Sequence, residues 1–355
     1  MREAAFRTVT HQQATQLLHN KFVVVLGDSI QRSVYKDLVL FLQRDSYLTQ
    51  CQLKSKGELF FEQDCLVEGG RLGHMTNGTE YREVRQYRTD HHLVRFYFIT
   101  RIFSKYMESI LADFENDAKP DVVIVNSCVW DVSRYNRKWV SEYREKLHKF
   151  FAKLKAVLPK ECLVVWNMTM PLGQKIVGGF LVPEIEHMGP TLRYDVIEAN
   201  FYGATLADAY GFNVLDLHFL FRFSLHHRMR DGVHWNAIVH RQITFLLLAH
   251  AAQAWGVMLS SPTAKEPSWY HPPQYDGFGP CFYEDQLPTV SQFHDGYISF
   301  ENNTSNNGGN YNSTPASSVP SCSRTGNSFV MRTKHTGKQQ YKPYSRQKHN
   351  PHYRY

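Results

Sequence analysis

Short apolar runs, separated by more polar segments, mark the chain as far as Gly256. Each run is too short for a buried helix, and each is rich in β-branched or aromatic residues. Such a run is typical of a central strand that is covered on both faces, as in a parallel sheet. Five such runs occur. The run at residues 93–99 contains Arg95, so we expect its strand to lie nearer an edge than the other four. The four central runs are residues 22–26 (FVVVL), 122–125 (VVIV), 163–166 (LVVW) and 212–217 (FNVLDL), and the fifth is 93–99 (LVRFYFI).

Segments with a helical period lie between these runs. Their apolar residues recur every three or four positions, which places them on one face of a helix. Strands that alternate with helices indicate right-handed βαβ crossovers, so the sequence predicts an α/β sandwich. The four repeats are Ile30, Val34, Leu38 and Phe41; Tyr143, Leu147, Phe150, Leu154 and Val157; Leu192, Val196, Ala199 and Leu206; and Val239, Ile243, Leu246 and His250.

The helical period stops near Gly256. Residues 302–323 are dominated by Asn, Ser, Thr, Gly and Pro, and residues 324–355 are basic and contain no Asp or Glu. Too few aliphatic side chains remain to offset the entropy of ordering, so the sequence predicts a disordered tail. We therefore expect a helical lead-in over 1–20, one α/β domain over 21–259 and a low-complexity basic tail over 260–355.

Composition and charge exclude several classes of protein. The net charge of +7 resides largely in the predicted tail. No run approaches the roughly 18 apolar residues that a membrane helix needs, so we expect no membrane insertion. The N-terminus lacks the apolar stretch of a signal peptide, and the six cysteines form no C-x-x-C pair. These patterns exclude an integral membrane protein, a collagen and a coiled coil. They favour reduced cysteines, no metal site and an intracellular, cytoplasmic location.

The tripeptide Gly27-Asp28-Ser29 follows the first predicted strand and opens a helix. Ligands of open α/β sheets bind at the carboxyl ends of the strands, where Ser29 would lie. Gly27 would permit the tight turn, and the positive end of the helix would act on the Ser29 hydroxyl. Taken alone, the tripeptide is better explained as an ordinary helix N-cap.

A second motif, Asp231-Gly232-Val233-His234, comes directly before the last predicted helix. A nucleophilic serine needs a base, and the imidazole of that base needs a carboxylate to orient it. A tight turn at Gly232 would present both side chains to one cleft. Alone, Asp231 could cap the helix and His234 could lie on the surface. Together with the serine motif, the two predict a triad of Ser29, His234 and Asp231.

In these motifs the chain resembles the SGNH/GDSL-type hydrolases. The wider context resembles the PC-esterase domain-containing proteins, relatives of cell-surface acyl esterases, from about Lys21 to Leu259. The blocks that carry this resemblance are VVVLGDSIQRSVYKDLVLFLQ, FEQDCLVEGG, VNSCVWDVSRY and DGVHWN.

The resemblance implies a flavodoxin-like three-layer α/β/α sandwich of SGNH-hydrolase type, with a central parallel sheet. It implies Ser29 as nucleophile, His234 as general base and Asp231 as its orienting partner. The implied reaction is hydrolysis or transfer of small acyl esters without a metal or organic cofactor. The oxyanion hole would use the Ser29 N–H and a glycine that follows the second strand, which Gly70 matches.

The chain departs from the family pattern in the third block, which is usually G-x-N-D. Here the sequence reads Asn-Ser-Cys-Val-Trp-Asp from Asn126, and Trp130 falls where the block would place its Asn. Either Asn126 or the Trp130 indole N–H could supply the missing donor. Loss of one oxyanion donor costs on the order of 10²–10³ in turnover. Asn126 and Asp131 could equally be turn residues.

Two further residues are candidates for substrate binding. Arg32 lies one turn into the helix after Ser29 and could bind an acidic group of the substrate; it could also be solvated or pair with Asp37. Trp235 follows His234 and could line the pocket or pack against the sheet.

Two functions follow from these expectations. The first is a serine-dependent acyl-esterase, with O-acyl groups of glycoconjugates among its candidate substrates. The second is a catalytically weak or inactive binding or regulatory protein of the same fold. Its basic, tyrosine-containing tail would contact RNA or another anionic partner through charge and stacking.

Overall fold

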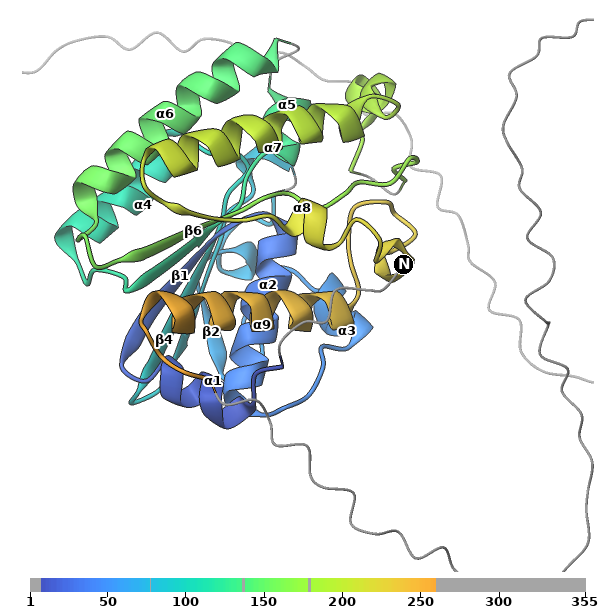
Figure 1. The fold of residues 1–355 in the computed structure, drawn as a ribbon. Coiled ribbons are helices and arrows are strands. Elements are labelled where there is room, and N and C mark those ends of the chain that lie inside the picture. The colour runs from blue at the N-terminus through green and yellow to red at the C-terminus, as the bar shows by residue number, and fades with distance from the viewer. Residues whose placement is uncertain (1–7, 77, 136–137, 178–179, 260–355) are drawn as a thin grey trace, which may run out of the picture. The chain divides into compact units, whose positions relative to one another are not determined.

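The computed structural model describes residues 8–76, 78–135, 138–177 and 180–259, all of which fall in one compact unit. A seven-stranded sheet lies between two layers of helices (Figure 1). The predicted tail over 260–355 lies outside the described residues. The strands are β1 (Lys21–Gly27), β2 (Asp64–Gly69), β3 (Glu83–Arg88), β4 (His92–Phe98), β5 (Val122–Val125), β6 (Leu163–Asn167) and β7 (Asn213–Leu215).

The strand order is β2-β3-β4-β1-β5-β6-β7. β4, β1, β5, β6 and β7 are parallel, whereas β3 pairs antiparallel with both β2 and β4. Counted along the chain, the parallel strands follow the doubly wound order 2-1-3-4-5, in which ligands bind at the carboxyl ends next to the first strand. The predicted flavodoxin-like α/β/α sandwich is confirmed, with an antiparallel extension at one edge.

Two strand predictions are wrong in position. β4 is not near an edge but lies between β3 and β1, because its Arg95 is accommodated by Gln86 of β3, whose side-chain oxygen accepts from Arg95 Nε at 3.0 Å. The run 212–217 does not form a central strand. It contributes only the short, half-buried edge strand β7.

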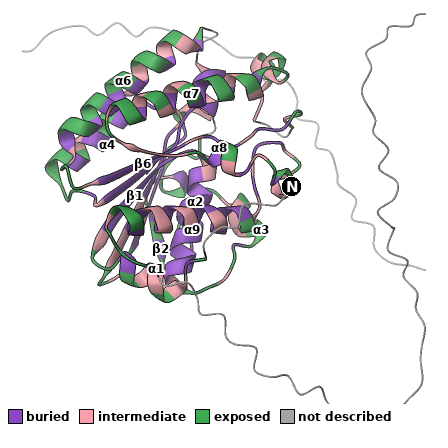
Figure 2. Cartoon of the chain, viewed as in Figure 1, coloured by how far each residue is buried: buried purple, intermediate pink, exposed green. Residues whose placement is uncertain are grey.

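Helices cover both faces of the sheet. α1, α2 and α9 pack on one face, and α4, α5, α6 and α7 pack on the other (Figure 1). The inner sides of the helices are buried and the outer sides are exposed (Figure 2). The helices are α1 (His11–Leu17), α2 (Ser29–Gln43), α3 (Gln50–Lys54), α4 (Lys105–Asn116), α5 (Val129–Arg134), α6 (Trp139–Val157), α7 (Leu192–Ala209), α8 (Leu217–Leu220) and α9 (Ala237–Ala254).

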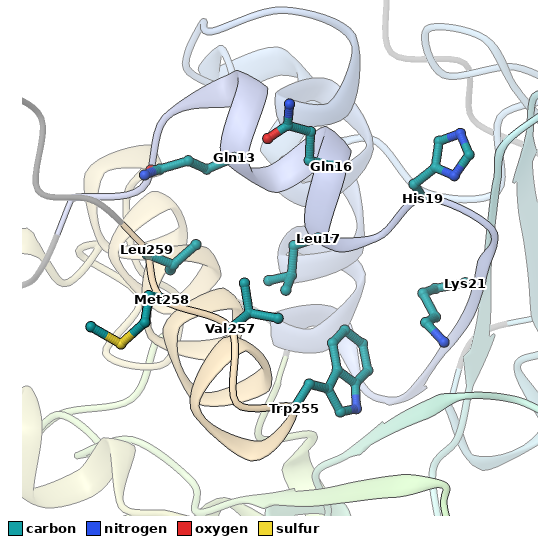
Figure 3. Close-up of a pocket in the computed structure, with 9 residues that line it drawn as sticks. All are labelled: Gln13, Gln16, Leu17, His19, Lys21, Trp255, Val257, Met258 and Leu259. Carbon is teal, nitrogen blue, oxygen red and sulfur yellow. The ribbon is translucent and has the colours of Figure 1, made fainter.

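A groove of about 470 Å³ lies where α1 meets the segment that follows α9 (Figure 3). It contains Lys21, the first residue of β1, whose Nζ lies 5.3 Å from the centre of the Trp255 ring. The groove is therefore at the amino end of β1. Ligand sites of this fold lie at the opposite, carboxyl end.

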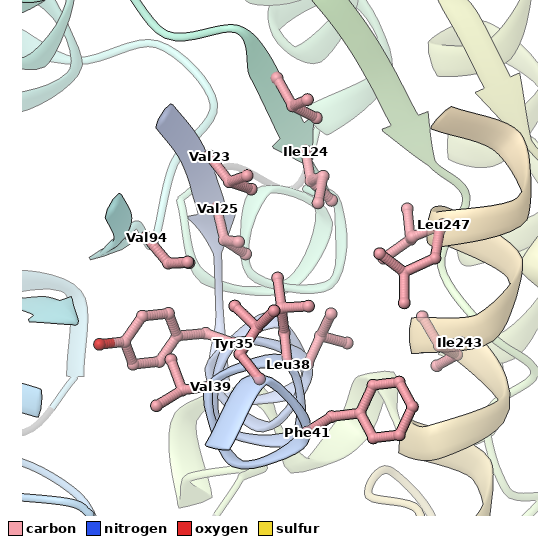
Figure 4. Close-up of a cluster of buried hydrophobic side chains, with 14 of the residues drawn as sticks. Val23, Val25, Tyr35, Leu38, Val39, Phe41, Val94, Ile124, Ile243 and Leu247 are labelled. Carbon is pink, nitrogen blue, oxygen red and sulfur yellow. The ribbon is translucent and has the colours of Figure 1, made fainter. Parts of the chain in front are cut away.

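Successive residues of β1 point to opposite faces of the sheet, as strand geometry requires. Val23 and Val25 belong to the core beneath α2 and α9, and Val24 and Leu26 belong to the core on the other face. Figure 4 shows the first of these cores, where Leu38 and Phe41 of α2, together with Ile243 and Leu247 of α9, surround the β1 valines.

α2 is buried along most of its length, and it carries three charged side chains into the interior: Arg32, Lys36 and Asp37. A buried charge is tolerated only when it is paired. Each of these side chains forms a salt bridge to a different part of the fold. Arg32 pairs with Glu83 of β3 at 3.1 Å, Lys36 pairs with Glu58, and Asp37 pairs with Arg241 of α9 at 3.1 Å.

We expect Arg241→Met to lower the free energy of unfolding by about 3–5 kcal/mol, because it leaves the Asp37 carboxylate buried without its cation. Chemical denaturation measures this loss. The matched control is Lys149→Met, which removes an exposed i,i+4 pair with Glu145 and should change the free energy by less than about 0.5 kcal/mol. Similar losses in the two variants would show that the buried Asp37–Arg241 pair contributes no more to stability than the exposed pair.

Candidate active site

Ser29 is the first residue of α2, directly after β1. Asp28 is the N-cap of this helix, and its Oδ1 accepts from the Ile30 N–H at 2.9 Å. Gly27 is needed for the turn, because a Cβ there would lie 2.3 Å from Cγ of Gln31. Capping therefore explains Asp28, and it leaves the Ser29 side chain facing the adjoining cavity.

Asp231 and His234 share one tight turn before α9. The Asp231 carboxylate accepts from the N–H groups of Val233 at 2.8 Å and His234 at 2.9 Å, and its Oδ2 lies 2.8 Å from Nδ1 of the His234 ring. Burial alone would raise the pKa of Asp231, but the hydrogen bonds from His234 and Val233 hold it well below its usual range. Asp231 is therefore ionised at neutral pH.

The other ring nitrogen of His234, Nε2, lies 2.8 Å from Oγ of Ser29. Because the ionised Asp231 accepts a hydrogen bond from the Nδ1–H, Nε2 of the neutral ring is the acceptor for the Ser29 hydroxyl. A continuous hydrogen-bonded chain thus runs from Ser29 through His234 to Asp231, although Ser29 and His234 are 205 residues apart. This arrangement can take a proton from a serine and stabilise the resulting imidazolium.

These side chains open onto a cavity of about 610 Å³. Its wall combines aromatic rings with cationic side chains, and the acidic residues among the described part of its lining are Asp28 and Asp231. The described residues that line it include Arg32, Lys54, Lys56, Tyr81, Phe98, Trp130, Arg134, Phe180 and Trp235. The sequence-predicted residues Arg32, Trp130 and Trp235 are therefore brought to the same cavity as Ser29.

Gly70 and Asn126 are not brought to this cavity. The Gly70 N–H donates to the Arg82 carbonyl at 3.0 Å. Gly70 does follow the second strand along the chain, but that strand, β2, is the outer antiparallel strand of the sheet and is separated from β1 by β3 and β4. The Asn126 amide donates to Asn167 O at 2.8 Å and to Thr169 Oγ1 at 3.0 Å. Neither predicted oxyanion donor points at the site.

The Ser29 N–H does remain available. No described residue accepts a hydrogen bond from it, and it lies at the positive end of the 15-residue helix α2. The Asp131 carboxylate, by contrast, is used structurally. It accepts from the Ile102 N–H at 3.2 Å and from the Ser127 hydroxyl, and burial raises its pKa to about 6.

Arg32 and Trp235 are almost completely buried, although both line the cavity. Arg32 is 6% exposed and pairs with Glu83, not with Asp37 as one of the sequence alternatives had it. Its guanidinium lies 5.6 Å from the centre of the Phe98 ring. Trp235 is 1% exposed and packs against Phe221 at a centroid distance of 6.1 Å. Both therefore support the fold as well as the cavity wall.

Arg134 and Phe180 were missed by sequence reasoning. Trp130 lies edge-on to Phe180 at 5.8 Å, and the Arg134 guanidinium lies 4.9 Å from the centre of the Trp130 ring. The spacing of Trp130 and Arg134 places them on one face of α5, a signal that could have identified Arg134. Phe180 belongs to a distant loop, and no local pattern points to it.

The described residues contain no group of three His, Cys, Asp or Glu side chains arranged to hold a metal ion. Within the same residues, no helix has the length and apolar character to cross a membrane.

Comparison with known proteins identifies close relatives. The chain is 59% identical over 256 residues to human PC-esterase domain-containing protein 1A, covering 71% of this chain and 56% of that protein. It is 55% identical over 249 residues to human PC-esterase domain-containing protein 1B, covering 70% and 58%. The chain thus spans less than two thirds of the length of these relatives. No protein-family model matches it.

Solved structures give only remote similarities. An acetylxylan esterase from Geobacillus stearothermophilus matches with a TM-score of 0.36 and 13% identity, covering 66% of this chain and 95% of that chain. A lipase/acylhydrolase from Enterococcus faecalis matches with a TM-score of 0.38 and 14% identity, covering 67% and 98%. These relationships are too distant to transfer a function to this chain.

The turn between Asp231 and His234 depends on Gly232, which has φ +81° and would place a Cβ 2.2 Å from the Lys175 carbonyl oxygen. We expect Gly232→Ala to lower the free energy of unfolding by about 2–3 kcal/mol, through backbone strain plus this clash. Gly211→Ala is the matched control, because Gly211 has φ +79° and nothing within 4 Å; it should cost about 1 kcal/mol. Equal losses in urea titrations would contradict the role of the Lys175 contact.

Proposed function

Over 70–71% of its length this chain belongs to the family of the PC-esterase domain-containing proteins, and from that premise we propose that it is a serine esterase that hydrolyses acyl esters. The observation that carries the proposal is the pair of 2.8 Å hydrogen bonds that link Ser29 Oγ to His234 and His234 to Asp231. Without the His234 base, the Ser29 hydroxyl would be a weak nucleophile at neutral pH.

The proposed reaction has two halves. Ser29 Oγ attacks the ester carbonyl carbon while Nε2 of His234 accepts the hydroxyl proton. The tetrahedral intermediate then collapses, His234 returns the proton to the departing alcohol, and an acyl group remains on Ser29. Water attacks this acyl-serine with His234 again as base, which releases the carboxylic acid and restores the serine. Asp231 stays ionised throughout and stabilises each imidazolium.

The negative oxygen of each intermediate needs hydrogen-bond donors. The Ser29 N–H, at the positive end of α2, is well placed to be one of them. With Gly70 and Asn126 bonded elsewhere, the Trp130 indole N–H is the remaining sequence-predicted candidate. A hole that is short of one donor would lower turnover by on the order of 10²–10³ relative to a complete one.

For the substrate we propose acyl esters, with O-acyl groups of glycoconjugates as the leading class. The cavity volume of about 610 Å³ is within the range of small-molecule sites, and its aromatic walls offer flat apolar faces to a sugar ring. The proposed mechanism requires no metal and no organic cofactor.

The alternative is a binding or regulatory protein with little or no turnover. The observation that favours it is that both Gly70 and Asn126 donate their hydrogen bonds within the protein. A contact of the basic tail with RNA or another anionic partner stays a prediction from the sequence, because the tail lies outside the described residues.

A fluorophosphonate probe and 4-nitrophenyl acetate test the proposal. We expect the wild type to be labelled at Ser29 and to hydrolyse the ester, and Ser29→Ala to abolish both. Asp231→Asn keeps the shape of the side chain but removes its charge, so turnover should fall by about 10⁴.

The matched control is Ser109→Ala, which removes an exposed hydroxyl of α4 that is not among the residues lining the cavity and should leave labelling and turnover unchanged. If the wild type is neither labelled nor faster than Ser29→Ala, the esterase proposal fails and the binding protein takes its place.

A further inference from the structure

The described residues that line the cavity include more cations than carboxylates. Four of the described residues that line it are cationic, whereas its carboxylates are Asp28 and Asp231. Asp28 caps α2 and burial raises its pKa. Asp231 is occupied by His234 and by two backbone N–H groups. Both carboxylates are therefore engaged by groups other than the cations of the wall, which are Arg32, Lys54, Lys56 and Arg134.

Arg134 differs from Arg32 in its surroundings. Arg32 has a buried counter-ion in Glu83, but no described carboxylate forms a salt bridge with Arg134. Glu184, exposed in the short 3₁₀ helix Pro183–Met188, attracts Arg134 only at longer range. The Arg134 cation is thus held at the cavity wall without a salt-bridge partner among the residues that the structure describes.

The Arg134 guanidinium is also partly dehydrated. It lies 4.9 Å from the centre of the Trp130 ring and 5.3 Å from that of Phe180, and it donates to the Phe180 carbonyl. Its Nε is buried and has no hydrogen-bond partner. Burial lowers the pKa of Arg134. Removing a charged group from water without a counter-ion is costly.

A ligand with a negative group would give Arg134 both a counter-ion and acceptors for its N–H groups. The planar guanidinium presents its N–H groups as a fork that matches the two oxygens of a carboxylate or phosphate. The two rings against Arg134 fix its orientation, so little side-chain freedom is lost when the anion binds. Arg134 on α5 and Ser29 on α2 line the same cavity, so one molecule can reach both.

We propose that the cavity selects esters that carry a fixed negative charge, a carboxylate or a phosphate, and that Arg134 is the residue that receives this charge while the ester carbonyl lies at Ser29. The inference rests on the proposed esterase function and adds the substrate class. In this arrangement Trp130 and Phe180 hold Arg134 in place and also pack against the body of the substrate.

Two matched esters test the proposal. 4-Acetoxybenzoate and 4-acetoxybenzamide share the acetyl group and the aromatic ring, and they differ in one negative charge. We expect the wild type to prefer the benzoate by about 10-fold or more in kcat/KM, as a charge-assisted hydrogen-bonded contact provides. The preference should shrink as the ionic strength rises. 4-Acetoxyphenyl phosphate, as a third substrate, shows whether a phosphate or a carboxylate is favoured.

Three variants test whether Arg134 causes the preference for the charged ester. Arg134→Met keeps an apolar side chain against Trp130 and should bring the benzoate-to-benzamide ratio close to one, whereas Arg134→Lys should keep part of the preference. Arg144→Met is the control, because Arg144 stacks on Tyr202 of α7 and does not line the cavity. The ratio does not depend on the fraction of active enzyme, so partial misfolding cannot imitate the expected result.

A wild-type ratio near one, or an unchanged preference in Arg134→Met, would overturn the inference while leaving the esterase proposal intact. Failure of the esterase proposal is distinguished from failure of the anion site by a binding measurement. If the wild type hydrolyses none of the esters, calorimetry with 4-hydroxybenzoate and 4-hydroxybenzamide on the Ser29→Ala protein still tests the anion site. Tighter binding of the benzoate that is lost on adding Arg134→Met supports the site, and equal binding of the two refutes it.

Discussion

A helix that is buried on most sides must neutralise every charge it carries into the interior, and α2 is such a helix. Its cations and its carboxylate are matched by Glu83 of β3, by Glu58 after α3, and by Arg241 of α9. Because unpaired charges in a protein interior are strongly unfavourable, these pairs determine both the rotation of α2 and its position along its axis. The ion pairs thereby connect β3, the segment after α3 and α9 to the same helix, α2.

The same constraint reaches the candidate site. Ser29 is the first residue of α2, and α9 begins directly after the turn that carries His234. The Asp37–Arg241 pair therefore joins the two helices whose amino ends present the serine and the histidine. On the other side of α2, the Arg32–Glu83 pair ties the cavity wall to β3, where the Tyr81 hydroxyl donates to the same carboxylate at 2.6 Å. The geometry around Ser29 depends in this way on ion pairs one to three turns away.

Sequence patterns predicted the elements whose environment is uniform. β1, β5 and β6 are covered on both faces and read as unbroken apolar runs, and α2, α6, α7 and α9 show the helical period. β2 and β3 escaped prediction because they bury charged residues, and pairs between distant residues make this possible: Asp64 of β2 pairs with Arg85 of β3, and Glu83 of β3 pairs with Arg32. The Gly70 prediction failed for a related reason, since a local block cannot reveal on which edge of the sheet its strand pairs. The structure brings Ser29, His234 and Asp231 together, and their catalytic roles stay a prediction. The sequence predicted Arg32 near the site. It could not predict the partner of Arg32, because Glu83 is 51 residues away and local spacing says nothing about such a pair.

The separation of Ser29 and His234 by 205 residues has a consequence for biosynthesis. A chain that emerges from the ribosome exposes Ser29 early, when β1 still lacks β5 and α2 lacks its cover. Asp231 and His234 arrive with the turn before α9, after all seven described strands of the sheet have been made. Since domains fold as units during synthesis, Ser29 cannot meet His234 until the domain is almost complete. Under the esterase proposal, incomplete chains therefore lack the base that Ser29 requires, and the order of synthesis delays the assembly of the proposed triad.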